Sequence, residues 1–423
     1  MSDHSNHTTR GTSAKVVAGS LLGGVACAIA LVAVPFAGGS EATITGAILL
    51  GFAVGWTLLA MLSTRLGDGT HRWAALPAAV LGLSAAALIV LTPSTQTLDT
   101  LGWIWPPLLL GLVLWMTAQT RRQPPSHRRS WLLYPVFAVM TFSAAGCGYE
   151  TIQTGSGGTP APVAGDRLVD VGGHRLNIRC VGSGSPAVVL ETGLGESASA
   201  IARWIAPQVG RTTRVCVYDR AGHGRSDVAP DTADAAHDLH VLLERAHVPA
   251  PYVMAGHSLG GAFALSYAHR YPSQVGGVVL LDSMHPHQTH TDASDMGPLL
   301  AVVPTLARTG IARLLVDPND GEPTAQARQF VRDVEQMPAQ LNRAAKLTSL
   351  GNRPLGVVTA DKDSQPGWTT HQNDLATLSS NSFHRTVAGS THQSLIDDEK
   401  DAAASSRAIR DIVVAVRNKQ AAK

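Results

Sequence analysis

The stretch PYVMAGHSLGGAFALSYAHRYP, residues 251–272, decides how the rest of the chain is interpreted. An apolar run at 252–255 leads into Gly256-His257-Ser258-Leu259-Gly260, and a segment rich in small residues follows. This order of strand, tight turn and helix is that of a nucleophile elbow, in which glycine on both sides of the serine relieves crowding. The turn would hold the Ser258 hydroxyl at a helix N-terminus, where backbone N–H groups favour developing negative charge.

Composition separates an apolar first third from a more ordinary remainder. The chain has 423 residues and a formal net charge of +2, and only 15% of its residues are charged. Soluble domains average roughly 25% charged residues, and the deficit here lies mostly in the first third. The small net charge gives no case for nucleic-acid binding. Four cysteines are too few for a disulfide-built scaffold.

Five apolar segments follow a polar tail at 1–15 and predict an all-α transmembrane region at 16–149. Segments of about 20 residues match a hydrocarbon layer of roughly 30 Å. A cleaved signal peptide is the alternative for the first segment, but four further segments disfavour it. The five segments run approximately over 16–36, 44–62, 73–91, 101–118 and 131–145. We therefore expect a multi-pass protein of the cell membrane, with the lipid bilayer as its partner.

The distribution of basic residues predicts the orientation of these segments. Alternate loops, and the N-terminal tail, contain all the basic residues near the segment ends: Arg10, Lys15, Arg65, Arg72, Arg121, Arg122, Arg128 and Arg129. The other two loops carry Glu41 and Asp99 and no Lys or Arg. The positive-inside rule then places the N-terminus in the cytoplasm and everything after Tyr149 outside it. Removing one segment from the count would reverse the second conclusion.

Residues 150–166 are rich in Gly, Ser, Pro and Thr and predict a flexible linker, followed by one large domain at 167–423. Apolar runs alternate with helical patterns there, which predicts a mostly parallel sheet with helices on both faces. The expected strands are 168–171, 176–180, 187–191, 214–218, 252–255, 277–281, 355–359 and 382–387. Between 283 and 353 the alternation stops, and we expect this insert to form a helical lid over the site.

Four motifs in this domain resemble those of the α/β-hydrolase superfamily of serine esterases, lipases and peptidases. They are Glu191-Thr192-Gly193-Leu194-Gly195, Asp219-Arg220-Ala221-Gly222-His223-Gly224-Arg225-Ser226, the elbow at 256–261, and a late aspartate and histidine. The resemblance covers approximately residues 168–416 and implies an α/β-hydrolase fold. It also implies a catalytic triad in the chain order Ser, Asp, His.

The triad predicted in this way consists of Ser258, His392 and an aspartate. An imidazole can accept the serine proton at neutral pH, and a carboxylate must fix its tautomer. Asp363 is the first choice, because it follows the penultimate strand, where the resemblance places the acid. Asp282, at the end of the strand after the elbow, is its main rival, and Asp361 is the third candidate.

The oxyanion of acyl transfer needs two backbone donors, which we assign to the N–H groups of Leu259 and Leu194. His257 and the segment at 219–226 are expected to have structural roles. His285, His287 and His290 lack the accompanying ligands of a metal site, so we expect no metal and no cofactor. Cys180 and Cys216 fall on strands that would be neighbours in such a fold, which predicts a disulfide.

These features together predict a membrane-anchored, extracytoplasmic serine hydrolase that cleaves an ester, amide or thioester of a small acyl substrate. An acyltransferase or perhydrolase would use the same triad, and a non-catalytic sensor or transport-associated module is a further alternative. The sequence identifies neither the substrate nor the oligomeric state.

Overall fold

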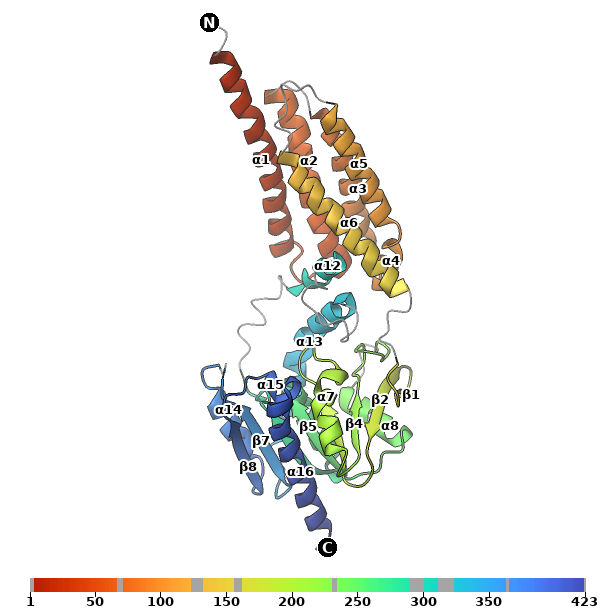
Figure 1. The fold of residues 1–423 in the computed structure, drawn as a ribbon, viewed down its shortest axis with the longest axis vertical. Coiled ribbons are helices and arrows are strands. Elements are labelled where there is room, and N and C mark those ends of the chain that lie inside the picture. The colour runs from red at the N-terminus through yellow and green to blue at the C-terminus, as the bar shows by residue number, and fades with distance from the viewer. Residues whose placement is uncertain are drawn as a thin grey trace. The chain divides into compact units, whose positions relative to one another are not determined.

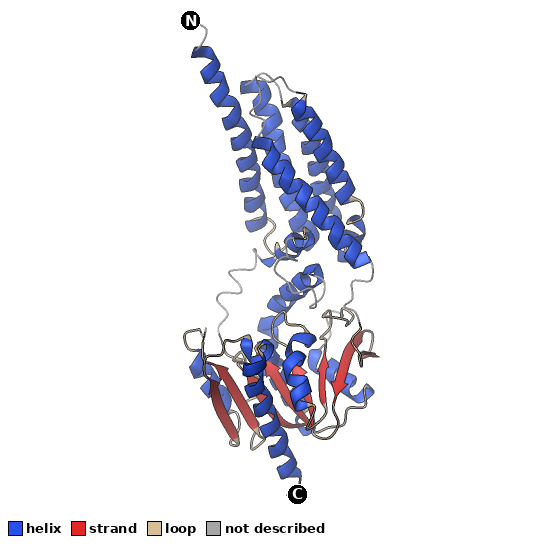
Figure 2. Ribbon diagram, viewed as in Figure 1, coloured by secondary structure: helices blue, strands red, loops and turns tan. Residues whose placement is uncertain are grey.

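The computed structural model describes residues 4–66, 71–122, 132–155, 162–229, 234–288, 300–310, 323–362 and 365–421. The chain forms two compact units. The first consists of Met1–Gly158 and Thr291–Asp317, and the second of Thr159–His290 and Pro318–Lys423. The first unit is helical and the second is built on a single sheet (Figures 1 and 2).

The first unit is a set of helices that lie alongside one another (Figure 1). They are α1 (His4–Ala33), α2 (Glu41–Leu66), α3 (Ala75–Leu91), α4 (Thr95–Leu101), α5 (Trp105–Arg121) and α6 (Tyr134–Gly155). Among the described residues, three helices (α1, α2 and α3) are long and apolar enough to cross a membrane. Counting α4 and α5, which bend by 45° at a short break, as one span gives four. The expected five spans are therefore not confirmed, since α6 is not among these helices.

Small residues bring α1 and α2 into close contact. A Cβ atom at Gly24 would lie 2.9 Å from the Cα atom of Gly55, and one at Gly51 would meet the backbone of Ala28. Helices in a membrane associate through surfaces of small residues of this kind. Lipid tails are as apolar as the helix side chains, so close packing and not the hydrophobic effect drives their association.

A short helix from the insert that follows residues 275–281 belongs to the first unit. Within that unit α12 (Val303–Arg308) contacts α2 and α6. The guanidinium of Arg308 donates to Glu41 Oε1 at 2.7 Å and to Asp99 Oδ1 at 3.0 Å. The insert expected as one lid at 283–353 is therefore divided, because its described residues 300–310 group with the N-terminal helices, whereas residues 323–353 group with the sheet.

The second unit contains an eight-stranded sheet in the order β1-β2-β4-β3-β5-β6-β7-β8. Its strands are β1 (Arg167–Asp170), β2 (Arg175–Val181), β3 (Ala187–Glu191), β4 (Val215–Tyr218), β5 (Tyr252–His257), β6 (Val275–Leu281), β7 (Leu355–Ala360) and β8 (Ser382–Val387). The pairs β1–β2 and β2–β4 are antiparallel and all others are parallel. Every residue of β3, β4, β5 and β7 is buried, as expected for parallel strands covered on both faces.

Helices cover both faces of this sheet (Figure 2). The flanking helices are α7 (Ala198–Val209), α8 (Ala235–Arg245), α9 (Leu259–Arg270), α13 (Pro323–Ala344), α14 (Trp368–Thr377), α15 (Ser394–Asp397) and α16 (Glu399–Ala421). On one face, alternate residues of the central strands pack against α7 and α16 in a core that includes Val188, Val253, Val279, Ile205 and Ile412. The helices α8 and α13 both contact α9. The predicted mostly parallel, helix-covered sheet is confirmed.

The predicted disulfide between the neighbouring strands β2 and β4 is present. Cys180 and Cys216 face each other on the antiparallel pair β2–β4 and are bonded, with Cα atoms 4.0 Å apart.

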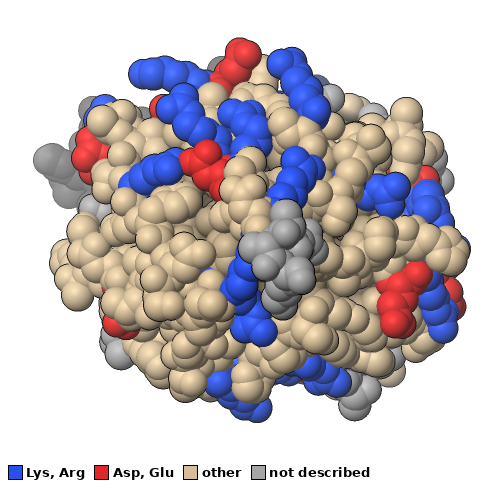
Figure 3. Space-filling view, turned by 90° about the horizontal axis from the view of Figure 1, so that it is seen from below, with Lys and Arg blue, Asp and Glu red and all other residues tan. Residues whose placement is uncertain are grey.

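In Figure 3, Lys and Arg side chains are scattered over a mainly neutral face and several lie beside Asp or Glu. One exposed pair joins Arg385 of β8 to Asp411 of α16 at 2.6 Å. Such a surface agrees with the small net charge of +2.

Candidate active site

Ser258 occupies a strained turn between β5 and α9. Its φ of 52° and ψ of −124° lie outside the regions that residues with a side chain normally adopt. The turn is possible because the residues two positions before and after Ser258 are glycines. A Cβ atom at Gly256 would meet the carbonyl of Gly260, and one at Gly260 would meet the carbonyl of Glu191. Strain that a close-packed surrounding maintains is typical of functional positions.

His392 lies in the loop after β8 and is directed by a carboxylate. Its Nδ1 atom is 2.6 Å from Asp282 Oδ2, and the His392 side chain is 37% exposed while that of Asp282 is only 3% exposed. The ring is also packed, with its centroid 4.5 Å from that of His257 and an edge contact to Trp368 at 6.0 Å. The imidazole is thus accessible to solvent, while its Nδ1 edge is fixed by a buried aspartate.

Asp282 is held at the end of β6 by two further hydrogen bonds. Its Oδ1 atom accepts from the N–H of Ala360 at 3.1 Å and from Trp368 Nε1 at 2.7 Å. Its backbone has a φ of 46°, in the left-handed region that residues with a side chain seldom adopt. Only Oδ2 remains for His392, and the three donors together satisfy the buried charge.

Of the two candidate acids that the structure describes, Asp282 is the one that contacts His392. Asp363 lies outside the described residues, and the carboxylate of Asp361 accepts instead from the N–H of Gly389 at 3.0 Å. The loop after β8 brings His392 to the end of β6. These two strands are not adjacent, since β7 lies between β6 and β8 in the sheet. Chain order alone did not indicate this contact.

Ser258 is joined to the other two residues through its neighbours in sequence. Its N–H donates to the carbonyl of Leu281, next to Asp282, at 3.1 Å. His257 Nε2 lies 2.9 Å from the carbonyl oxygen of His392. Among the described residues, neither the Ser258 hydroxyl nor His392 Nε2 has a hydrogen-bond partner, so the structure shows no direct hydrogen bond between the serine and the histidine.

The sequence did not reveal the role of Glu196. Its Oε1 atom is 2.6 Å from His257 Nδ1, and its Oε2 atom accepts from the N–H of Gly193 at 2.6 Å. Both ring nitrogens of His257 therefore face oxygen atoms, and the imidazole donates to both of them when it is doubly protonated. A glutamate directly after the glycine-rich turn was the available signal, but its partner lies 61 positions away.

Charge pairing outweighs burial at this pair. Burial opposes the charge of His257, but the adjacent Glu196 carboxylate holds the pKa of His257 above its ordinary value. Burial also opposes the charge of Glu196, yet His257 and the N–H of Gly193 hold the pKa of Glu196 below its ordinary range. The ion pair links the loop after β3 to the backbone of the His392 loop.

Arg220 binds the backbone of the loop after β3. Its guanidinium donates to the carbonyl of Thr192 at 2.7 Å and to the carbonyl of Gly193 at 3.0 Å. The N–H groups of Gly193 and Gly195 are both taken by carboxylates, from Glu196 and from Asp333. Among the described residues, the N–H groups of Leu194 and Leu259 have no partner, which leaves the two expected oxyanion donors free.

The histidines after β6 form a separate group. His285 Nε2 is 2.8 Å from Asp374 Oδ2, and the His285 ring stacks on that of His371 at 4.8 Å. His290 lies outside the described residues. In the described part of the chain, no group of three His, Cys, Asp or Glu side chains is arranged to hold a metal ion.

Comparison with known proteins agrees with this architecture. The family model described as the alpha/beta hydrolase fold matches residues 186–319. The second unit has the α/β-hydrolase fold. We call it the hydrolase unit below, a name that refers to its fold.

Curated relatives match only a part of this chain. YbdG of Bacillus subtilis is 30% identical over 126 residues, which are 29% of this chain and 38% of YbdG. The 2-hydroxy-6-oxo-2,4-heptadienoate hydrolase of Pseudomonas putida is 31% identical over 141 residues, 30% of this chain and 48% of that enzyme. The 2-(acetamidomethylene)succinate hydrolase of Mesorhizobium japonicum is 34% identical over 122 residues, 27% of this chain and 42% of that enzyme. The chain thus spans less than half of each relative.

Solved structures resemble the hydrolase unit at low sequence identity. A thermophilic esterase from Thermogutta terrifontis is 18% identical, with a TM-score of 0.49, and the match covers 60% of this chain and 99% of the esterase.

Proposed function

We propose that this protein is a membrane-anchored serine hydrolase that cleaves an ester, amide or thioester of a small acyl substrate. The observation that carries the proposal is the 2.6 Å contact of His392 Nδ1 with the buried carboxylate of Asp282, beside a serine in a strained elbow. The hydrolases among the curated relatives support the same class of reaction.

In the proposed mechanism, Ser258 Oγ attacks the acyl carbonyl while His392 Nε2 takes the hydroxyl proton. Asp282 keeps the other imidazole proton on Nδ1 and stabilises the imidazolium that forms. The imidazolium then donates its proton to the leaving group, which departs and leaves an acyl-enzyme on Ser258. A water molecule, deprotonated by His392, then attacks the acyl carbon. The bond from that carbon to Ser258 Oγ breaks, the imidazolium returns its proton to Ser258 Oγ, and the acid is released.

Two backbone N–H groups, those of Leu259 and Leu194, would stabilise the oxyanion in both steps. Leu259 is the first residue of α9, so its N–H has no intrahelical acceptor and the helix dipole adds to it. Leu194 lies between two glycines whose own N–H groups are already bonded. Removal of one such donor typically costs about 3 kcal/mol of transition-state stabilisation.

Two observations support an extracytoplasmic hydrolase unit with a cytoplasmic N-terminus, a topology that also requires α6 to cross the membrane as a fifth span. The Cys180–Cys216 disulfide favours an oxidising compartment. The insert helix α12 contacts Glu41 through Arg308, at the end of α2 opposite Arg65. Because basic residues favour the cytoplasmic side, that end of α2 belongs on the outer side.

The test is the labelling of intact cells with a membrane-impermeant fluorophosphonate probe. We expect the wild-type protein to be labelled at Ser258 and the Ser258→Ala variant to remain unlabelled. Labelling that needs lysed cells would overturn the location and keep the nucleophile. Equal labelling of the Ser258→Ala variant would overturn the nucleophile.

A further inference from the structure

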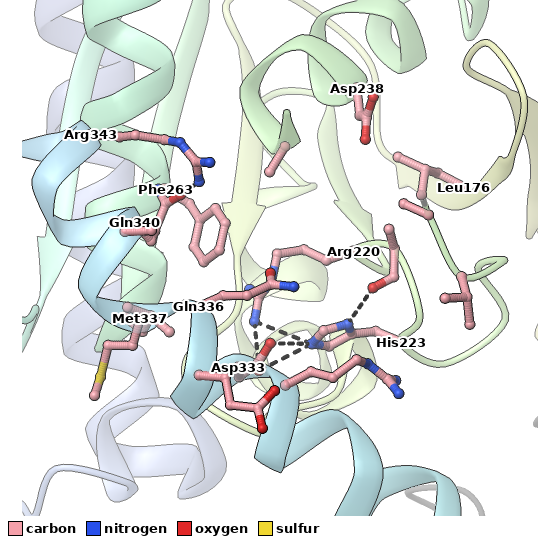
Figure 4. A pocket seen from close by; sticks show the side chains of 18 of the residues that line it. Leu176, Arg220, His223, Asp238, Phe263, Asp333, Gln336, Met337, Gln340 and Arg343 are labelled. Carbon is pink, nitrogen blue, oxygen red and sulfur yellow. Dashed lines mark hydrogen bonds and ion pairs between the residues drawn. The ribbon is translucent and has the colours of Figure 1, made fainter. Parts of the chain in front are cut away.

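Asp333 of α13 lies at the centre of a buried polar cluster beside the proposed oxyanion hole. Its side chain is 7% exposed, and its Oδ2 atom is 3.2 Å from Arg220 Nη2. The same oxygen is 3.1 Å from His223 Nε2 and accepts from the N–H of Gly195 at 3.1 Å. Figure 4 shows Asp333, Arg220 and His223 converging. A residue of the insert therefore binds the backbone of the loop after β3.

The contacts of Asp333 and Arg220 enclose Leu194 on both sides. Arg220 holds the carbonyl of Gly193, before Leu194, and Asp333 holds the N–H of Gly195, after it. Arg220 is itself fixed, since its guanidinium lies 4.4 Å from the ring centroid of Phe263 on α9. Each peptide unit next to Leu194 is thus tied to a buried charged side chain.

Such restraint matters because this loop is rich in glycine. Gly195 has a φ of 68°, a conformation that glycine adopts freely and that other residues avoid. A Cβ atom there would lie 2.9 Å from the Phe330 ring, so α13 packs directly on the loop. An oxyanion donor must lie within about 2.7–3.1 Å of the developing charge, so small rotations of the Leu194 peptide would remove its contribution.

We propose that Asp333 is a positioning residue, which holds the Leu194 N–H in the oxyanion hole by fixing Gly195 and Arg220 and so makes catalysis depend on the docking of α13. This inference rests on the serine hydrolase function proposed above. Asp333 forms part of the wall of a cavity of about 360 Å³ that Leu259 also lines and that Ser258 and His392 do not. It therefore acts through the loop and not on the reacting atoms.

The electrostatics of the cluster keep the carboxylate in its accepting form. Burial opposes the charge of Asp333, but Arg220 and His223 outweigh burial and hold the pKa of Asp333 well below its usual range. The N–H of Gly195, Arg220 Nη2 and His223 Nε2 all lie within 3.2 Å of Oδ2 of this carboxylate. In Asp333→Asn the negative charge beside Arg220 is lost. With the amide oxygen in the place of Oδ2, the amide NH2 replaces the Oδ1 atom that lies 3.1 Å from His223 Nε2, so the contacts that hold Gly195 and Arg220 are weakened.

The experiment compares Asp333→Asn with Glu335→Gln, an equal charge change at an exposed position of the same helix. Full-length protein in detergent is assayed with a soluble p-nitrophenyl ester and with an arylboronic acid, whose tetrahedral adduct with the serine mimics the oxyanion. For Asp333→Asn we expect kcat to fall about 10- to 100-fold, KM to change less than 3-fold, and the boronate inhibition constant to rise in parallel with the loss of kcat. Glu335→Gln should match the wild type within 2-fold.

A second variant covers the case in which Asp333→Asn does not fold. Arg220→Lys keeps the positive charge but cannot reach the carbonyls of Thr192 and Gly193 together, and it should give the same loss of kcat with little change in KM. If the folded variant behaves like Glu335→Gln, or if KM changes and kcat does not, the positioning role is overturned. Ser258→Ala serves as the separate test, since full activity there would refute the hydrolase proposal itself.

Discussion

Substitution of Asp282 by Asn tests the proposed triad most sharply, because the hydrogen bonds of Asp282 determine the outcome. Oδ1 accepts from the N–H of Ala360 and from Trp368 Nε1, so the amide oxygen of Asn must occupy this position. The amide NH2 then faces His392 Nδ1, which must accept and can no longer carry a proton. The remaining imidazole proton moves to Nε2, the atom that should receive the proton of Ser258.

The expected loss follows from this tautomer. A base that already carries a proton on Nε2 cannot deprotonate the serine, and the same aspartate-to-asparagine change in another Ser-His-Asp enzyme lowers kcat about 10⁴-fold. That factor corresponds to about 5.4 kcal/mol of activation free energy at 1.36 kcal/mol per tenfold change. Asn tolerates the positive φ of 46° at this position, so the fold should persist.

The assay measures kcat on a p-nitrophenyl ester and the rate of fluorophosphonate labelling, with thermal unfolding as the check on folding. The matched controls are Asp361→Asn and Asp363→Asn, which change the two other candidate acids and should keep at least a third of the wild-type kcat. The reasoning would be refuted if Asp282→Asn kept more than a tenth of the activity, or if Asp363→Asn caused the large loss.

Three further substitutions test other contacts. Glu196→Gln should lower the unfolding free energy by about 3–5 kcal/mol near pH 6, because it leaves the buried His257 without its counter-charge. The pKa of His257 is raised on folding, so the stability that the charged His257 contributes is complete below about pH 6.5 and is lost as the pH rises through the raised value. The unfolding free energies of the wild type and of Glu196→Gln should therefore converge at higher pH. A difference between them that grows with pH would contradict this assignment. The double variant Cys180→Ser/Cys216→Ser should lose about 4 kcal/mol of unfolding free energy, measured with denaturant, because the disulfide closes a loop with a sequence separation of 36 residues. Serine in place of either free cysteine, Cys27 or Cys147, should have little effect. Gly260→Ala should abolish fluorophosphonate labelling and lower the thermal midpoint, because its methyl group would overlap the backbone of β3; a labelled variant of normal stability would show that the elbow tolerates a side chain.

Local patterns in the sequence were sufficient to predict most of the strands and the elbow. A buried parallel strand needs a continuous apolar run, and a strained serine needs glycine neighbours, so both features are visible within a few residues. The disulfide was also predictable once Cys180 and Cys216 were placed on neighbouring strands. The number of membrane spans was less certain, since α6 contains polar residues and is not among the helices that satisfy both length and apolarity.

The amino-acid sequence alone determined the sheet, the nucleophile turn and the histidine after the last strand, since each depends on side-chain size and polarity over a short range. Only the tertiary structure decided which aspartate contacts His392, that Glu196 pairs with His257, and that Asp333 of the insert reaches Gly195. Strand ends at one edge of a parallel sheet bring several carboxylates close together, and the choice among them depends on loop conformations and on partners 61 to 138 positions apart. Residue spacing carries no information on contacts of that kind.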